Sequence, residues 1–255
     1  MPRPRLAQPR RPATRDGLLL WVIHRFSEAL ADHAVLKEGM ALRLLDCPRR
    51  TNDLDYVFVP YDSKKTILPI IERVLAGLEG AAVTPSLNSK AARFEVRLDS
   101  AAIQVEVSVD TECDAIPVAT AALAAEQAAP SQVVRIMAPD VALAHKLAAW
   151  NERRLLRDLY DAYFLSARVR ARPSRAVLKK RLANVQSRIP RLRKRKSMTL
   201  ESFLSELDEA LATLTDEALA EELAGLLEAS ELPGLALRIR SGISRLGEEL
   251  RQSSG

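Results

Sequence analysis

Strand-like and helix-like patterns occupy different parts of this 255-residue chain. Apolar and polar residues alternate with a period of two in residues 93–98 and 103–109, which is typical of half-buried strands. From Pro139 to the end, apolar residues recur at helical spacing instead. Because strands and helices fall into separate runs, we predict an α+β protein with a helical C-terminal half.

We divide the chain into three parts. Residues 1–15 contain four prolines and five arginines, which indicates a disordered basic arm. Residues 16–135 form the predicted core, whose first helix begins with Asp16 as the N-cap. Residues 136–255 form the helical domain. No apolar run approaches the ~18 residues needed to cross a bilayer, and the chain has only two cysteines, so we expect a cytoplasmic protein without a membrane segment.

Acidic residues are expected to gather on one polar sheet face. Asp53 and Asp55 are two residues apart in a predicted strand, and Glu106 lies on the polar side of strand 103–109. Neighbouring carboxylates repel unless a cation offsets their charge, and the usual cation is Mg²⁺. Two such ions can orient an attacking hydroxyl and stabilise a leaving pyrophosphate.

Each of these acids also fits an ordinary position on its own. Asp53 and Asp55 could be a turn cap and a solvated strand start, and Glu106 could be a surface strand residue. The third acid has competitors, because Asp110 shares the strand face by parity and Asp99 is near in sequence.

Two blocks of sequence resemble the AbiEii/AbiGii family of nucleotidyltransferase toxins, which act in abortive-infection and toxin–antitoxin systems and include the MenT toxins. Residues 35–59, VLKEGMALRLLDCPRRTNDLDYVFV, are similar to the family pattern LKGGTALRL followed by D-[LI]-D. Residues 143–165, LAHKLAAWNERRLLRDLYDAYFL, are similar to its lysine and RD block. The resemblance implies a DNA polymerase β-like nucleotidyltransferase core, a small mixed sheet with flanking helices, followed by a helical domain.

The resemblance also implies roles for individual residues. Asp53, Asp55 and Glu106 would be the catalytic acids and the ligands of two Mg²⁺ ions, and Glu106 would assist deprotonation of the acceptor hydroxyl. The nucleoside triphosphate (NTP) would be held at Gly39, Met40, Lys146, Arg157, Asp158 and Asp161. The implied partners are an NTP, a cognate antitoxin and an acceptor, which is a tRNA 3′ end, a protein hydroxyl or a small molecule.

The spacing of charged residues in the second block, residues 143–165, indicates a common helix face without the resemblance. On one continuous helix, Lys146, Arg153, Arg157 and Asp161 would share a face. The alternative is a plain surface ion pair between Arg157 and Asp161, which would contribute only about 0.3–0.5 kcal/mol. The segment 140–167 reads as one long helix or as two.

The turn before the first acid departs from the family pattern. This chain has Glu38-Gly39-Met40 where the family has Gly-Gly-Thr or Gly-Ser, so a phosphate-binding hydroxyl is missing and Glu38 adds a negative charge. The leading hypothesis is a Mg²⁺-dependent nucleotidyltransferase that moves a nucleoside monophosphate from an NTP to an acceptor hydroxyl, with a tRNA 3′ end as the first acceptor. The departure at this turn favours an alternative function, a catalytically degenerate member that binds nucleotide or RNA. A third hypothesis is a helical nucleic-acid-binding regulator, whose binding would not depend on Asp53 and Asp55.

Positive charge is concentrated in residues 168–196, here called the basic belt. Thirteen lysines and arginines and no acid lie between Ser166 and Leu200, whereas twelve acids follow from Glu201 onward. We predict binding of RNA through its phosphates. The alternative is a solvated face that pairs with the acidic stretch after it. The candidate RNA-binding residues are Arg181, Arg188, Arg191, Arg193, Lys194, Arg195 and Lys196.

Overall fold

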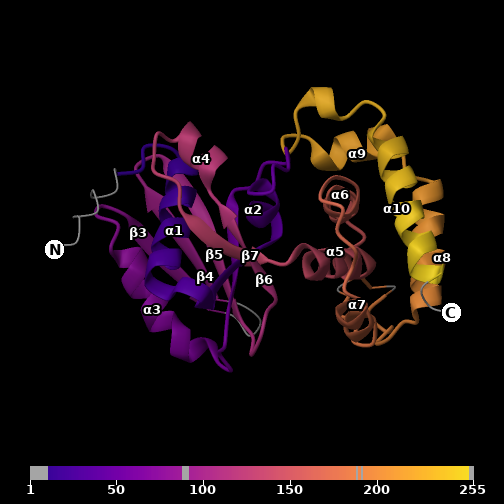
Figure 1. Ribbon diagram of the computed structural model, residues 1–255, viewed down its shortest axis with the longest axis horizontal. Helices are drawn as coiled ribbons and strands as arrows, with labels where there is room; N and C mark the ends of the chain where they lie inside the picture. The colour runs from indigo at the N-terminus through magenta and orange to yellow at the C-terminus, as the bar shows by residue number, and fades with distance from the viewer. Residues whose placement is uncertain (1–10, 88–91, 188, 191, 253–255) are drawn as a thin grey trace. The chain divides into compact units, whose positions relative to one another are not determined.

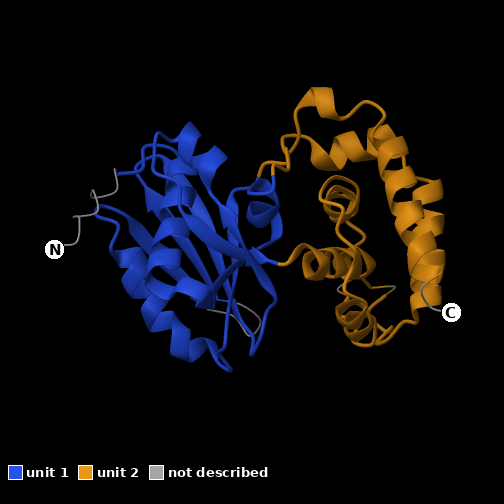
Figure 2. Ribbon diagram, in the orientation of Figure 1, with its two compact units in different colours: residues 1–45, 51–137 blue, residues 46–50, 138–255 orange. Residues whose placement is uncertain are grey.

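The structure is a computed structural model that describes residues 11–87, 92–187, 189–190 and 192–252. It divides into two compact units (Figure 2). Unit 1 comprises residues 1–45 and 51–137, and unit 2 comprises residues 46–50 and 138–255. Unit 1 contains the sheet and unit 2 is helical, so the predicted α+β class is confirmed.

Unit 1 is built on a seven-stranded mixed sheet of order β3-β4-β5-β2-β1-β7-β6 (Figure 1). Strand β2 runs parallel to β5 and antiparallel to β1. The two predicted strands 93–98 and 103–109 are present as β4 and β5, which pair antiparallel. The strands are β1 (Ala34–Lys37), β2 (Asp53–Phe58), β3 (Ala82–Leu87), β4 (Ala92–Leu98), β5 (Ala101–Val109), β6 (Ala115–Ala119) and β7 (Val133–Met137). The sequence did not predict β3, β6 or β7.

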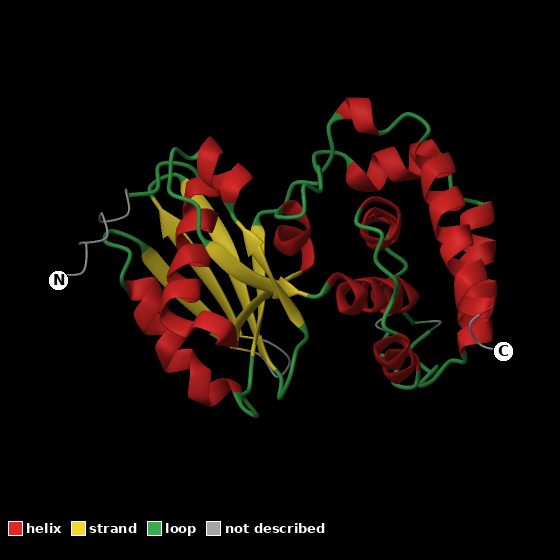
Figure 3. Ribbon diagram, viewed as in Figure 1, coloured by secondary structure: helices red, strands yellow, loops and turns green. Residues whose placement is uncertain are grey.

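The two faces of the sheet differ because its strands alternate. In β5, Ile103, Val105 and Val107 are buried, while the residues between them are half-exposed. The buried face packs against α1 (Arg15–Leu30) and α3 (Lys64–Ala76), which form the core with it (Figure 3). Two shorter helices, α2 (Glu38–Arg43) and α4 (Ala121–Glu126), complete unit 1. The opposite face of the sheet carries the polar residues of these strands.

Each edge strand of the sheet contains a proline. Pro85 lies in β3 opposite Phe94, and Pro117 lies in β6 opposite Arg135. Proline has no N–H for a neighbouring strand, so it is tolerated in sheets mainly at edges. Both edges of the described sheet follow this rule.

The first helix begins earlier than predicted. Thr14 is the N-cap of α1, and its hydroxyl accepts a hydrogen bond from a backbone N–H of the first turn. The predicted cap, Asp16, lies inside the helix, where Arg43 donates two hydrogen bonds to its carboxylate at 2.8 and 2.7 Å. The prediction of Asp16 as the cap was therefore wrong. Of the predicted arm 1–15, residues 1–10 lie outside the described residues.

Unit 2 consists of helices around the buried Trp150, whose ring meets Phe203 edge to face at 6.0 Å. The segment predicted as one or two helices forms two, because Arg154 adopts a left-handed backbone (φ 56°) and ends the first. The helices are α5 (Pro139–Arg153), α6 (Leu156–Tyr163), α7 (Arg175–Leu182), α8 (Leu200–Ala212), α9 (Asp216–Leu223) and α10 (Leu235–Gln252). Among the described residues, no helix combines the length and the apolar character that a membrane span requires.

Candidate active site

A row of charged side chains crosses the polar face of the sheet in unit 1. Asp55 on β2 lies directly opposite Glu106 on β5 and, on its other side, opposite Lys37 on β1. Glu106 in turn lies opposite Arg93 on β4. Residues paired across neighbouring strands point to the same face. The row Lys37, Asp55, Glu106, Arg93 therefore places two carboxylates between two cations, and we call it the charged row.

A second, more polar row runs beside the charged row. Asp53 begins β2 and lies opposite Gln104, which lies opposite Glu95, which lies opposite Thr84. Asp53 and Asp55 are two residues apart in the same strand and share its polar face. The structure thus brings the three predicted acids, Asp53, Asp55 and Glu106, onto one surface of unit 1.

Asp55 sits in an environment that disfavours its negative charge. Burial raises the pKa of this carboxyl to about 6, and the negative charges of Glu38, Glu106 and Asp53 push it in the same direction. The cation Lys37 opposes them and lowers the pKa, but it does not balance the other causes. A cation placed at Asp55 would relieve this repulsion.

The carboxylates of the polar face fit a metal ion that takes its other ligands from a substrate. Among the described residues, no group of three or more histidine, cysteine or acidic side chains could hold a metal ion alone. Mg²⁺ commonly binds to one or two carboxylates and takes its other ligands from substrate phosphates and water. Asp53 and Asp55 supply such a pair. Glu106 instead accepts a hydrogen bond from Arg93 Nε at 2.8 Å.

The turn between β1 and α2 directly follows Lys37, one member of the charged row. Glu38 directly follows β1 and has a positive φ of 59°, a conformation that favours glycine. Gly39 is buried at the second position of α2. The Met40 side chain is fully buried in the core of unit 1, so only its backbone is left to meet a phosphate.

Four of the residues predicted to hold the NTP lie in unit 2, where one of them, Asp161, forms a buried ion cluster. Lys146 Nζ lies 2.8 Å from Asp161 Oδ2, and Arg49 donates to the same carboxylate at 2.7 and 3.1 Å. The Asp161 side chain is only 1% exposed. The Asp161 carboxylate thus holds two cations in the interior of unit 2.

Sequence reasoning missed two members of these clusters, Arg49 and Lys37. Arg49 belongs to the short segment 46–50, which reads as a simple connection between helix and strand. Its partner Asp161 is 112 positions away, and no spacing rule links them. Lys37 becomes important only through the register of β1 against β2.

The shared helical face predicted for the second block is absent because α5 ends at Arg153. Asp158 is buried and accepts two hydrogen bonds from Arg153, at 3.1 and 2.7 Å. Arg157 is exposed, and its backbone N–H donates to Glu222 at 2.9 Å. The alternative surface pair of Arg157 with Asp161 is also not formed, since Asp161 binds Lys146 and Arg49 instead.

The basic belt is partly paired with acids of its own unit. Arg181 forms an ion pair with Glu152 at 2.9 Å, and Arg195 pairs with Glu206. Arg172, elsewhere in the belt, pairs with Glu249. Three of the predicted RNA-binding cations are exposed, namely Arg193, Lys194 and Lys196. Two others, Arg188 and Arg191, lie outside the described residues.

A mixed sheet that presents two aspartates two residues apart after a glycine-containing strand-to-helix turn, followed by a helical unit, is the arrangement of a nucleotidyltransferase. The family model described as nucleotidyl transferase AbiEii toxin, type IV toxin–antitoxin system, matches residues 21–240. The chain belongs to this AbiEii family, and the predicted resemblance is confirmed. It is a nucleotidyltransferase of the toxin type.

Solved structures with similar folds extend over nearly the whole chain. The nucleotidyltransferase toxin MenT4 of Mycobacterium tuberculosis has a TM-score of 0.60 and 15% identity, covering 91% of this chain and 82% of its own. JHP933 of Helicobacter pylori has a TM-score of 0.52 and 16% identity, covering 94% and 93%. At such identities the likeness concerns the fold alone. A search of curated proteins gave no match.

Proposed function

We propose that this protein uses Mg²⁺ to transfer a nucleoside monophosphate from an NTP to the 3′-terminal hydroxyl of an RNA, most simply a tRNA. The acceptor oxygen forms a bond to the α-phosphorus, the bond from that phosphorus to the bridging oxygen breaks, and pyrophosphate leaves. The observation behind this proposal is the position of Asp55, which lies among like charges on the polar face of the sheet. Such a carboxylate is suited to a cation–phosphate complex.

Each group in unit 1 has a place in this reaction. Asp53 and Asp55 would hold one or two Mg²⁺ ions, which supply charge neutralisation for the phosphates when bound. Glu106 lies opposite Asp55 and is the proposed acceptor for the proton of the attacking hydroxyl. Gly39 and the backbone of Met40 would contact a phosphate.

The cations of unit 2 support binding of the triphosphate. Lys146 and Arg49 both contact the Asp161 carboxylate, and all three side chains are buried. Electrostatic attraction is stronger there than in water. We propose that this cluster binds the triphosphate, with Lys146 as the principal contact.

An RNA acceptor is supported by the distribution of charge. The formal net charge is +5, and Arg193, Lys194 and Lys196 are exposed in the basic belt. Exposed cations of this kind bind phosphate backbones without reading sequence. We further propose that the protein acts in the cytoplasm, where NTP and RNA are both present, and that its toxicity is controlled by the antitoxin that the family implies.

One observation favours a second candidate function, a family member that binds nucleotide or RNA without catalysis. Glu38 contributes to the raised pKa of Asp55 and stands where the family pattern has glycine. A negative charge at this turn opposes binding of phosphate. The experiment below separates the two functions.

The test is transfer of label from each NTP, labelled at the α-phosphate, into total bacterial RNA in the presence of Mg²⁺. The variant Asp53→Ala/Asp55→Ala removes the acids, and Asp62→Ala, an exposed aspartate of the same unit, is the matched control. We expect label in a tRNA-sized band with the wild type and the Asp62 variant only. If no NTP gives transfer while both wild type and double variant still bind RNA, the transferase proposal is wrong and the binding function replaces it.

A further inference from the structure

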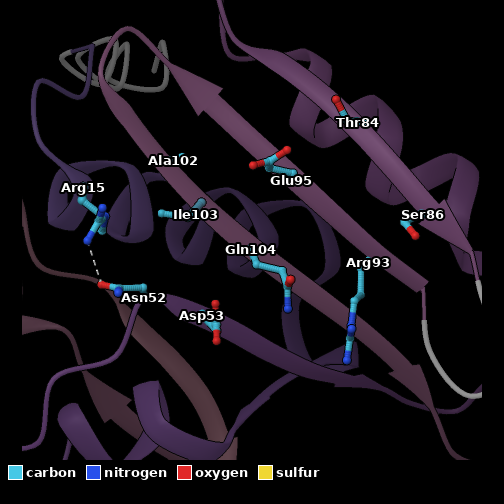
Figure 4. A pocket seen from close by; sticks show the side chains of 10 residues that line it. All are labelled: Arg15, Asn52, Asp53, Thr84, Ser86, Arg93, Glu95, Ala102, Ile103 and Gln104. Atoms are coloured by element: carbon cyan, nitrogen blue, oxygen red, sulfur yellow. Dashed lines mark hydrogen bonds between the residues drawn. The ribbon is translucent and has the colours of Figure 1, made fainter. Parts of the chain in front are cut away.

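A pocket of about 480 Å³ opens on the polar face of the sheet directly beside Asp53 (Figure 4). It extends from β2 across β5 and β4 to the edge strand β3. Figure 4 shows Gln104 between Asp53 and Arg93, all three bordering the same space. The polar side chains that line it include Asn52, Thr84, Ser86, Arg93, Glu95 and Gln104. A pocket of this size can hold one nucleotide.

The chemistry of the lining selects among possible ligands. Gln104 offers both a hydrogen-bond donor and an acceptor, and Thr84 and Ser86 add hydroxyls. Asn52 adds an amide whose Oδ1 accepts a hydrogen bond from Arg15 at 3.1 Å. Such groups suit a ribose with adjacent hydroxyls. None of the described residues that line the pocket is aromatic, so these residues offer no platform on which a base could stack. Ala102 and Ile103 contribute the apolar part of the pocket lining, which is small. The pocket is therefore poorly suited to bind an apolar peptide segment.

Two cations line the pocket, Arg15 and Arg93, and Arg93 lies at a suitable distance from the acids. Arg93 is two strands away from Asp55 in the charged row, a separation of about 10 Å at the usual strand spacing. One nucleotide can bridge this distance with its sugar hydroxyl near the acids and its 5′ phosphate near the guanidinium. Arg93 uses Nε for Glu106 at 2.8 Å, and the guanidinium has further N–H groups to donate.

We propose that this pocket receives the 3′-terminal ribonucleotide of the acceptor RNA. Gln104 and Asn52 bind the ribose hydroxyls, and Arg93 binds the 5′ phosphate of that nucleotide. The terminal hydroxyl is thereby held beside Asp53. This inference rests on the proposed transferase function, because the pocket is assigned to the acceptor of that reaction. Binding of RNA in the pocket can be measured even when no nucleotide is transferred.

The test measures binding of a fluorescently labelled short oligoribonucleotide with a free 3′ hydroxyl to the full chain. Arg93→Gln removes the phosphate contact, and Thr84→Trp fills the pocket from the exposed edge strand while leaving Arg93 and Glu106 in place. Arg73→Gln, an exposed arginine of α3, is the matched control for charge. We expect both pocket variants to weaken binding about ten-fold or more, the scale of one charged hydrogen bond, and the control to leave it unchanged.

Two further readouts separate this proposal from loss of fold and from the transferase function. The increase in melting temperature caused by NTP with Mg²⁺ should be the same in wild type and Thr84→Trp, because this variant leaves the charged row intact. An oligonucleotide with a 3′-terminal 2′-deoxyribose should bind more weakly to the wild type, because one hydroxyl contact is lost.

If folded Arg93→Gln and Thr84→Trp both bind the oligoribonucleotide as the wild type does, the pocket proposal is overturned even when transfer occurs. If binding falls in both variants but the wild type transfers no nucleotide with any NTP, the pocket stands and the transferase function fails.

Discussion

Asp55 is half-buried and has three acidic neighbours. The free energy of unfolding should therefore depend on pH through the ionisation of this carboxyl. Its pKa of about 6 lies above the ordinary value of 3.8, so the folded protein favours the protonated form. The stability contributed by this group is complete below pH 3.8 and is lost as the pH rises through 6. At neutral pH without Mg²⁺, ionised Asp55 should cost the fold roughly 1–3 kcal/mol.

We therefore expect Asp55→Asn to raise the melting temperature at pH 7.5 in the absence of divalent ions. The gain should shrink as the pH is lowered to 4.5, because the wild-type carboxyl becomes neutral. Thermal melts at both pH values measure this, and a variant that is less stable than wild type at pH 7.5 would contradict it. The same variant should lose the extra stabilisation that NTP with Mg²⁺ gives to the wild type.

A second prediction at the residue scale concerns Glu38. A left-handed backbone costs a non-glycine residue about 1–2 kcal/mol, and the flexibility of glycine in the unfolded chain offsets about 0.5–1 kcal/mol. Glu38→Gly should therefore stabilise the protein by up to about 1 kcal/mol. It also removes one negative charge that raises the pKa of Asp55, so the acidic limb of the pH–activity profile should move to lower pH.

Asp46→Gly is the matched control, since Asp46 has a φ of 66° and is not among the causes of the shifted pKa of Asp55. Chemical denaturation and the pH–activity profile of both variants give the comparison. An equal displacement of the two pH profiles would show that charge at Glu38 is not responsible.

At the scale of elements, α10 and α6 approach closely at Gly242. A Cβ at this position would lie 2.8 Å from Tyr163 Cδ2, whereas one at Gly247 would meet only ordinary contacts at 3.7 Å. Alanine gains about 1 kcal/mol over glycine inside a helix, and overpacking costs about 1–3 kcal/mol. Gly247→Ala should stabilise the protein, and Gly242→Ala should be clearly less stable than Gly247→Ala. Equal melting temperatures for the two variants would rule out the close contact.

The ion cluster that joins the segment 46–50 to α5 and α6 gives another prediction. Asp161→Asn leaves Arg49 and Lys146 buried without their carboxylate, which should cost about 3–5 kcal/mol. Asp208→Asn breaks the half-exposed pair with Arg251 and should cost at most about 1 kcal/mol. Urea unfolding of both variants checks the contrast. Similar losses would mean that burial of the cluster has little energetic effect.

Elements with a strong local pattern could be predicted from the sequence, and the others could not. The alternation in β5 marked its buried and polar faces correctly, and the acids of β2 followed from the same rule. Strand β7 was not predicted because it depends on pairing with β1, which lies about 100 residues earlier in the sequence. The break at Arg154 lacks the usual glycine or proline signal, so one helix and two helices looked equally plausible.

At the scale of the whole molecule, the sequence predicted two domains as consecutive segments, whereas the chain passes between the two units three times. Residues 46–50 belong to unit 2 although unit 1 precedes and follows them. The backbone N–H of Arg50 donates to Leu226 at 2.8 Å, which ties this segment to unit 2 only three positions before Asp53. A boundary of this kind depends on tertiary contacts and cannot be found from local composition.

The prolines at the two edges of the sheet limit how other proteins can bind unit 1. A chain that extends a sheet needs a continuous series of N–H and C=O groups along the edge, and Pro85 and Pro117 interrupt that series at opposite ends of the strand order. Strand addition is therefore disfavoured at both edges, for aggregation as well as for regulation. An inhibitor that neutralises this toxin through unit 1 would have to recognise its side chains.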